Sequence, residues 1–205
     1  MSAPRTAWFA AVMGKEDGVR GPDAATERLF VAVPLTEKAR QEIIARLPAL
    51  PGRLVPPQNW HFTLRFLGDA EPRMRELLIA ELRRAHFGFA FSIRFGGLGA
   101  FPRAKRARIV WLGVDDGADR LISVAETVES AVRRAGFPAE ERPFRPHLTL
   151  SRIEPTRSVA EVLTGQPPLN VQMQVIEVAL VRSELGKGPA QYQTVENFRL
   201  EQTPL

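Results

Sequence analysis

Residues 61–68 read HFTLRFLG and residues 147–153 read HLTLSRI, so the chain uses the phrase His-x-Thr-Leu twice. It has only three histidines in 205 residues, and two of them stand in this phrase. Both stretches begin with alternating polar and apolar side chains, which is typical of a β-strand with one face against a core. Side chains two positions apart point to the same face of a strand. Each phrase therefore predicts a strand that buries its Phe or Leu side chains and presents His and Thr on the other face.

The segments around the two phrases predict an alternation of strands and helices. Residues 29–33 (LFVAV) form an apolar run closed by Pro34, which indicates a strand, and Thr36 is placed to cap a helix that ends before Pro48. Further helices are expected from Pro72 to Gly88 and over residues 119–136, with a short one at 158–163. Further strands are expected over residues 89–102, 106–114, 171–181 and 191–200, the first of them ending in a glycine turn (GGLG).

This order of elements places each His-x-Thr phrase on a strand that follows a helix, once in each half of the chain. It predicts an α+β fold with two pseudo-symmetric lobes of mostly antiparallel sheet, helices on the outside, and a cleft between the lobes. Residue identity between the halves is too low to prove an internal duplication. Residues 28–205 are expected to form this single bilobal domain.

Residues 1–27 lack the pattern of a core and are interpreted as a disordered N-terminal extension. They contain one short apolar patch, residues 7–13, followed by a stretch rich in Gly, Asp and Pro. A secretory signal is a less favoured alternative, because the patch is short and no Ala-x-Ala site follows it promptly. Translation that starts at Met13 is the other alternative.

Composition restricts the classes of function. Hydrophobic residues make up 44% and charged residues 25%, and no apolar run approaches the roughly 18 residues that cross a bilayer. The chain contains no cysteine, which excludes disulfides, thiolate metal sites and a cysteine nucleophile and fits a cytoplasmic protein. A net charge of +5 favours polyanionic partners, although charge alone is weak support for nucleic acid.

Two imidazoles and two hydroxyls around one small volume suit phosphodiester chemistry. An imidazole with an ordinary pKa of about 6.5 accepts or donates a proton near neutral pH. His61 and His147 could therefore divide the work, one activating a nucleophile and the other protonating a leaving oxygen. The hydroxyls of Thr63 and Thr149 could donate hydrogen bonds to phosphate oxygens, whose charge grows toward the transition state.

Arg152 could add charge-assisted bonds to a phosphate. Simple alternation would put it on the face opposite His147, so this role requires the strand to end or bulge by Ser151. A single His-x-Thr is common by chance, whereas two copies in matching apolar frames favour a site. His86 ends a helix, where a histidine caps carbonyls or interacts with the helix dipole, and is assigned no catalytic role.

Other chemistries fit the sequence less well. A zinc hydrolase needs about three His, Asp or Glu ligands, and the sequence shows no His-Glu-x-x-His motif or comparable cluster, so neither a metal nor a cofactor is expected. FGGLGAFP (residues 95–102) resembles a phosphate-binding loop only superficially, because no Gly-Lys-Ser/Thr follows. The basic run RAKRAR (residues 103–108) is most often a solvated strand edge, but beside a phosphate site it could guide RNA.

The two phrases and their flanks resemble the two-histidine phosphoesterase superfamily, and within it the bacterial and archaeal RNA 2′,3′-cyclic phosphodiesterases, also called 2′-5′ RNA ligases. The resemblance covers about residues 28–201 and rests on the segments RLFVAVPL, VPPQNWHFTLRFLG, GLGAFP, RARIVWLGV, RPFRPHLTLSRI and QYQTVENFRL. It implies a bilobal fold with both motifs in one cleft. It also implies metal-independent opening of a terminal 2′,3′-cyclic phosphate to a 2′-phosphomonoester.

Carried over residue by residue, the resemblance implies that His61 donates a proton to the leaving 3′ oxygen and that His147 accepts one from water. Thr63 and Thr149 would hold phosphate oxygens, and Arg152 would bind the phosphate. The partner would be an RNA or nucleotide end that carries a 2′,3′-cyclic phosphate, with no membrane and no obligate protein partner, and a monomer is expected.

Two alternatives stay open at this point. One is a non-catalytic RNA-end-binding module that uses the same cleft, and the other is the reverse reaction, which joins RNA ends through a 2′-5′ linkage. Trp60 or Phe144 could stack on a base, but a place in the core is favoured for both.

Overall fold

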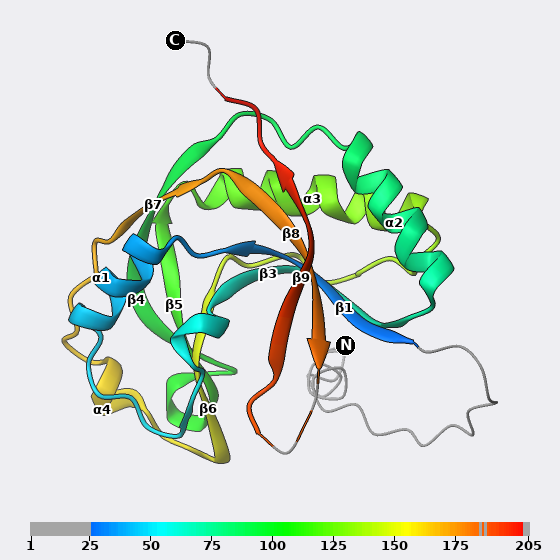
Figure 1. The fold of residues 1–205 in the computed structure, drawn as a ribbon. Coiled ribbons are helices and arrows are strands. Elements are labelled where there is room, and N and C mark those ends of the chain that lie inside the picture. Colours follow the sequence, from blue (N-terminus) through cyan, green and yellow to red (C-terminus); the bar gives the residue numbers. More distant parts are fainter. Residues whose placement is uncertain (1–25, 185, 187, 203–205) are drawn as a thin grey trace, which may run out of the picture.

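The computed structural model describes residues 26–184, 186 and 188–202, and its strands form two antiparallel sheets (Figure 1). The first sheet has the strand order β3-β1-β8-β9 and the second β2-β6-β5-β4-β7. The strands are β1 (Glu27–Pro34), β2 (Arg53–Leu54), β3 (His61–Ala70), β4 (Phe91–Phe101), β5 (Ala107–Asp116), β6 (Leu148–Arg157), β7 (Gln172–Val175), β8 (Glu177–Glu184) and β9 (Gln191–Arg199). The helices are α1 (Glu37–Arg46), α2 (Pro72–Arg84), α3 (Ala118–Arg134) and α4 (Ala160–Leu163), and two 3-10 turns are η1 (Pro57–Asn59) and η2 (Ala104–Arg106). The expected N-terminal extension lies almost wholly outside the described residues.

Each sheet contains one His-x-Thr strand beside an earlier strand from the same half of the chain. β3 pairs with β1, and β6 pairs with β5, both antiparallel. One helix, α1 or α3, connects each pair of strands. The halves also exchange strands, because β2 from the first half pairs with β6 and β8 from the second half pairs with β1. The predicted α+β fold with two similar lobes is therefore confirmed, and each sheet contains strands from both halves of the chain.

The long helices lie outside the sheets, as expected. α2 and α3 lie side by side (Figure 1), and α3 also contacts β3, while α1 contacts β7. Thr36 caps α1, since its Oγ1 accepts a hydrogen bond from the Ala39 backbone N–H at 3.3 Å. The apolar face of α3 is buried at Leu121, Val124, Ala125, Val128 and Val132, and each such Leu or Val stabilises the fold by about 1.5–3 kcal/mol. No helix in the described part of the chain is long and apolar enough to span a membrane.

The glycine-rich stretch GGLG does not form the predicted turn. β4 continues through it to Phe101, and Gly99 pairs with Trp111 of β5. A Cβ atom at Gly99 would lie 2.2 Å from the Trp111 ring, and one at Gly96 would lie 1.9 Å from the Asp115 carboxylate. These glycines therefore make room for the side chains of Trp111 and Asp115 on the neighbouring strand.

The alternating stretch 171–181 was predicted as one strand, and this is wrong. β7 belongs to the second sheet and β8 to the first, with Ile176 between them. Buried and exposed side chains alternate along β7, whereas residues 178–181 of β8 are all buried. The alternation therefore ends where the chain changes sheet, and β8 is covered on both faces.

Candidate active site

His61 is the first residue of β3, and contacts on several sides fix its ring. Its Nδ1 lies 2.8 Å from the backbone carbonyl oxygen of Asn59. A carbonyl oxygen can only accept, so Nδ1 carries the proton and donates it, and Nε2 is the nitrogen left to exchange protons with a substrate. The ring stacks on Phe30 with centroids 4.7 Å apart, and Tyr192 meets it edge-on at 5.3 Å.

His147 stands directly before β6 and is held in the same way. Its Nδ1 lies 2.7 Å from the carbonyl oxygen of Arg145, and Phe101 meets the ring edge-on at 5.1 Å. In both lobes the histidine thus donates to the carbonyl two residues earlier, and Nε2 stays free of that bond. The pseudo-symmetry of the fold therefore extends to the tautomer of the two imidazoles.

Thr63 and Thr149 lie on the strands that follow the two histidines, and both side chains are partly exposed. Within the described residues, neither hydroxyl is engaged in a hydrogen bond, so both are available to a ligand. The apolar residues of the two phrases are buried as predicted: Phe62, Leu64, Leu148 and Leu150.

A bulge in β6 brings Arg152 to the same face as Thr149. Trp111 pairs with Thr149 but Val110 pairs with Ser151, so Leu150 is an extra residue on β6. The bulge reverses the alternation, and Arg152, opposite Ile109, comes to the face that Trp111 and Thr149 share. The strand therefore bulges before Ser151, which is what a phosphate-binding role of Arg152 requires. In the described part of the chain its guanidinium forms no ion pair with a carboxylate.

The electrostatics of the site couple groups from both sheets. Burial, together with the charges of Arg152 and His147, lowers the pKa of His61 from 6.5 to about 4, and the hydrogen bond to the Asn59 carbonyl opposes this shift. Burial also lowers the pKa of His147 and that of Arg152, where the nearby Tyr192 opposes the shift. In the unliganded protein both imidazoles are therefore neutral at pH 7, and Arg152 supplies the positive charge.

Tyr192 is the most informative residue that the sequence did not reveal. It lies on β9, where it pairs with Ser183 of the neighbouring strand β8. Its ring contacts the rings of both His61 and Phe30. Burial raises its pKa, while the charges of Arg152 and Arg28 act in the opposite direction. Tyr192 reaches the site because β9, from the C-terminal end of the chain, joins the first sheet. The only signal in the sequence was that the chain contains a single tyrosine.

The aromatic residues that the sequence did suggest lie elsewhere. Trp60 is 5% exposed and donates its Nε1–H to the carbonyl of Val55 at 3.0 Å, and Phe144 packs against the core. Both are core residues, as favoured. The aromatic side chains around the two histidines are instead Phe30, Phe101, Trp111 and Tyr192.

His86 lies away from the site. Its side chain is 90% exposed, and Nδ1 is 3.9 Å from a carboxylate oxygen of Glu201. The predicted capping of α2 by this histidine is wrong, because the helix ends at Arg84 and Ala85 is the C-cap. Among the described residues no group of three or more His, Asp or Glu side chains is placed to hold a metal ion.

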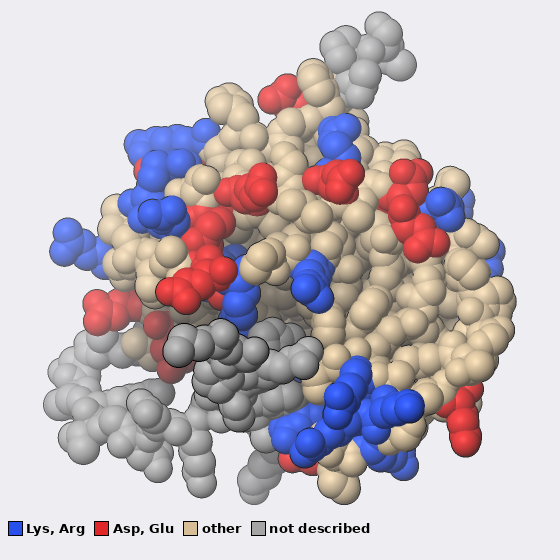
Figure 2. All heavy atoms as spheres, turned by 180° about the vertical axis from the view of Figure 1, so that it is seen from behind, with Lys and Arg blue, Asp and Glu red and all other residues tan. Residues whose placement is uncertain are grey.

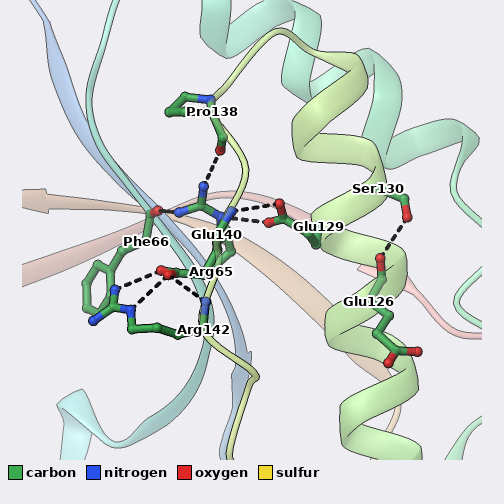
Figure 3. Close-up of polar contacts among 8 residues, drawn as sticks. All are labelled: Arg65, Phe66, Glu126, Glu129, Ser130, Pro138, Glu140 and Arg142. Atoms are coloured by element: carbon green, nitrogen blue, oxygen red, sulfur yellow. Dashed lines mark hydrogen bonds and ion pairs between the residues drawn. The ribbon is translucent and has the colours of Figure 1, made fainter. Parts of the chain in front are cut away.

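Arg65 joins the first His-x-Thr strand to the segment that leads to the second (Figure 3). Its Nε lies 2.8 Å from Glu129 on α3, and its other nitrogens donate to the carbonyls of Phe66 and Pro138. Glu129 in turn accepts the backbone N–H of Glu140 at 2.9 Å. Since this segment carries the chain from α3 to the second histidine, the network fixes one motif relative to the other.

Two antiparallel sheets that each present one His-x-Thr strand define a two-histidine phosphoesterase. The model of the family described as LigT like Phosphoesterase matches the chain twice in succession, over residues 33–111 and 112–190. Each match contains one of the two motifs. The chain therefore belongs to the LigT-like phosphoesterase family.

Two relatives named RNA 2′,3′-cyclic phosphodiesterase are similar to the chain over nearly their whole length. The RNA 2′,3′-cyclic phosphodiesterase of Aquifex aeolicus is 32% identical over 183 residues, which are 84% of this chain and 97% of the relative. That of Escherichia coli is 32% identical and covers 86% and 98%. Among solved structures, E. coli LigT complexed with 3′-AMP superimposes with a TM-score of 0.73 at 31% identity, covering 86% of this chain and 99% of that one. A Thermus thermophilus protein, TT0787, gives 0.68 at 30% identity, with 84% and 97% covered.

Proposed function

We propose that this protein is a cytoplasmic RNA 2′,3′-cyclic phosphodiesterase, which opens a terminal 2′,3′-cyclic phosphate to a 2′-phosphomonoester. One observation carries the proposal: two imidazoles of the same tautomer share a site with a partly buried arginine that has no carboxylate partner in the described chain. An uncompensated guanidinium favours an anion, and paired imidazoles supply both proton transfers of a phosphodiester hydrolysis. The relatives named RNA 2′,3′-cyclic phosphodiesterase support the substrate class.

Each side chain has a role in this reaction. As water attacks phosphorus, Nε2 of His147 accepts a proton from it. As the bond between phosphorus and the 3′ oxygen breaks, Nε2 of His61 donates a proton to that oxygen, and the phosphate stays on the 2′ oxygen. Thr63, Thr149 and Arg152 donate hydrogen bonds to the non-bridging oxygens, where negative charge grows. One turnover leaves His61 neutral and His147 charged, so the pair exchanges protons with solvent before the next.

The low pKa of His61 has a consequence for the donor role. With a pKa of about 4, only about one molecule in a thousand carries the donor proton at pH 7. An anionic phosphate beside the ring favours the charged form and raises the pKa. Binding of the substrate therefore helps to protonate the group that later gives the proton to it.

The pH dependence of kcat/KM should be bell-shaped, with its maximum on the acid side of pH 6.5. Activity requires one charged and one neutral imidazole, and this form is most abundant between the two pKa values of the free protein. Both are lowered, that of His61 to about 4, so kcat/KM should fall about tenfold per pH unit above the higher of the two. The two apparent pKa values of this pH profile describe the coupled imidazole pair and not His61 or His147 alone. Initial rates at low substrate between pH 3.5 and 9 measure the profile, and an optimum above pH 7 contradicts the electrostatics described above.

Product analysis tests the proposal itself. The protein is incubated with EDTA and with cytidine 2′,3′-cyclic phosphate, and the product is compared with 2′- and 3′-phosphate standards by chromatography. We expect the 2′-phosphate alone. A 3′-phosphate, or activity that appears only after a metal is added, would overturn the proposal.

A non-catalytic RNA-end-binding module is the weaker candidate, because binding an anion does not need two imidazoles of matched tautomer. Ligation through a 2′-5′ linkage at the same site is not the reverse of this hydrolysis: the 5′-hydroxyl of a second RNA end attacks phosphorus in place of water, the same bond to the 3′ oxygen breaks, and the phosphate stays on the 2′ oxygen. The concentration of 5′-hydroxyl ends relative to water decides between ligation and hydrolysis.

A further inference from the structure

A group of exposed basic side chains lies at the end of the second sheet. Figure 2 shows Lys and Arg atoms gathered on the side of the molecule where Figure 1 places η2, the turn between β4 and β5. We call this the basic surface and define it by five exposed residues: Arg53, Arg103, Lys105, Arg106 and Arg157. The basic run at 103–108 was interpreted as a solvated strand edge. Its first residues form the turn η2, and only its last two belong to a strand, the start of β5.

The basic surface is continuous with the candidate active site. Arg53 lies opposite Arg152 in the pairing of β2 with β6, and its charge lowers the pKa of Arg152. At the far end of β6, Arg157 pairs with Ala107, the residue that follows η2. Arg157 is five positions after Arg152, which is about 16 Å along a strand. Positive charge is therefore present at both ends of this part of β6, beside the candidate site and at the tip of the sheet, with the exposed Glu154 between them.

The cations of this surface are uncompensated. Within the described residues, none of the five makes an ion pair, and neither do Glu154 on β6 and Glu161 on α4, the carboxylates that flank Arg157 along the chain. Other arginines on the surface are neutralised: Arg83 pairs with Glu196 at 2.7 Å, and Arg134 pairs with Glu81 at 2.7 Å. Like charges gathered without counter-charges repel one another, and a polyanion relieves that repulsion.

We propose that the basic surface binds the sugar–phosphate backbone of an RNA strand on the 5′ side of its cyclic phosphate. This rests on the proposed function. A 2′,3′-cyclic phosphate can only stand at the 3′ end of a strand, so the rest of the strand leaves the site in the 5′ direction. Contacts with phosphates carry no base selectivity and weaken with salt. Oligoribonucleotides are therefore the preferred substrates, with little preference for sequence.

The test compares two substrates and two charge-matched variants. The substrates are cytidine 2′,3′-cyclic phosphate and a single-stranded ten-nucleotide RNA ending in the same group. The variant R103Q/K105Q/R106Q removes three charges from the basic surface, and R73Q/R84Q/R133Q removes three exposed charges from α2 and α3 on the other side of the molecule. On the RNA, the first variant should raise KM roughly tenfold and reduce the slope of log(kcat/KM) against log[salt] by up to about 2. On the mononucleotide it should match the parent protein, and the second variant should match the parent on both substrates.

Each other result has a definite meaning. The proposal is overturned if R103Q/K105Q/R106Q loses the same activity on both substrates, or loses none on the RNA. It is also overturned if R73Q/R84Q/R133Q loses as much activity on the RNA, because the effect then comes from net charge and not from the basic surface. If the parent hydrolyses neither substrate, the proposed function fails, and fluorescence anisotropy with a labelled RNA ending in a 2′-phosphate then decides about the surface. Weaker binding by R103Q/K105Q/R106Q alone supports an RNA surface without turnover. Equal RNA binding by the parent protein and both variants overturns the proposal that the basic surface binds RNA.

Discussion

Alanine in place of either His61 or His147 is expected to lower kcat/KM for a 2′,3′-cyclic mononucleotide by at least about 100-fold. Each change removes the Nε2 that the carbonyl of Asn59 or Arg145 leaves free. The double variant should lose little more than the worse single one, because the two imidazoles act in one step. Steady-state rates with the cyclic mononucleotide measure the losses.

His86→Ala is the matched control, because this third histidine is 90% exposed and distant from the site. It should keep the activity of the parent protein. His61→Asn keeps a donor for the carbonyl of Asn59 but lacks Nε2, so it separates the lost proton transfer from the loss of that hydrogen bond. Activity of any variant at His61 or His147 within about fivefold of the parent would contradict the proposed roles.

A sulfur substrate assigns the acid and the base. When sulfur replaces the bridging 3′ oxygen of the cyclic phosphate, the leaving thiolate departs without a proton, since thiols are far more acidic than alcohols. The loss caused by His61→Ala should then shrink below about tenfold, while that caused by His147→Ala stays large. The opposite pattern would exchange the two roles.

The parts of the site that could be predicted are those set by local pattern. Alternation alone indicated that His61 and Thr63 share one face of a strand and that Phe62 and Leu64 are buried on the other, and the structure agrees. The same holds for the second phrase. These predictions hold because the period of a strand depends only on neighbouring residues.

The parts that escaped prediction depend on pairing between distant segments. The bulge at Leu150, which turns Arg152 toward the site, exists only against the register of β5. Tyr192 reaches His61 because β9 joins the first sheet through β8. The glycines of β4 indicated a turn by composition, but Gly99 serves to accommodate the Trp111 ring and Gly96 the Asp115 carboxylate. Sequence patterns record which face a residue takes and carry no information on which strand lies beside it.

Arg152→Met should lower kcat/KM for the cyclic mononucleotide by about 100- to 1,000-fold, the loss typical of a donor that stabilises transition-state charge. Arg152→Lys should recover part of the activity, since lysine keeps the charge but loses the planar pair of donors. Arg157→Met, on the same strand but exposed, is the control and should leave mononucleotide hydrolysis unchanged.

Two further measurements distinguish a binding role of Arg152 from a structural one. Burial lowers the pKa of this guanidinium, and it has no carboxylate partner in the described chain, so its removal relieves a desolvation cost. The free energy of unfolding of Arg152→Met should therefore equal or exceed that of the parent protein while activity collapses. Because the charge of Arg152 lowers the pKa of His61, that pKa should rise in the variant, which proton NMR of the imidazole follows. A destabilised Arg152→Met with an unchanged His61 titration would mean that Arg152 supports the fold and does not face the phosphate.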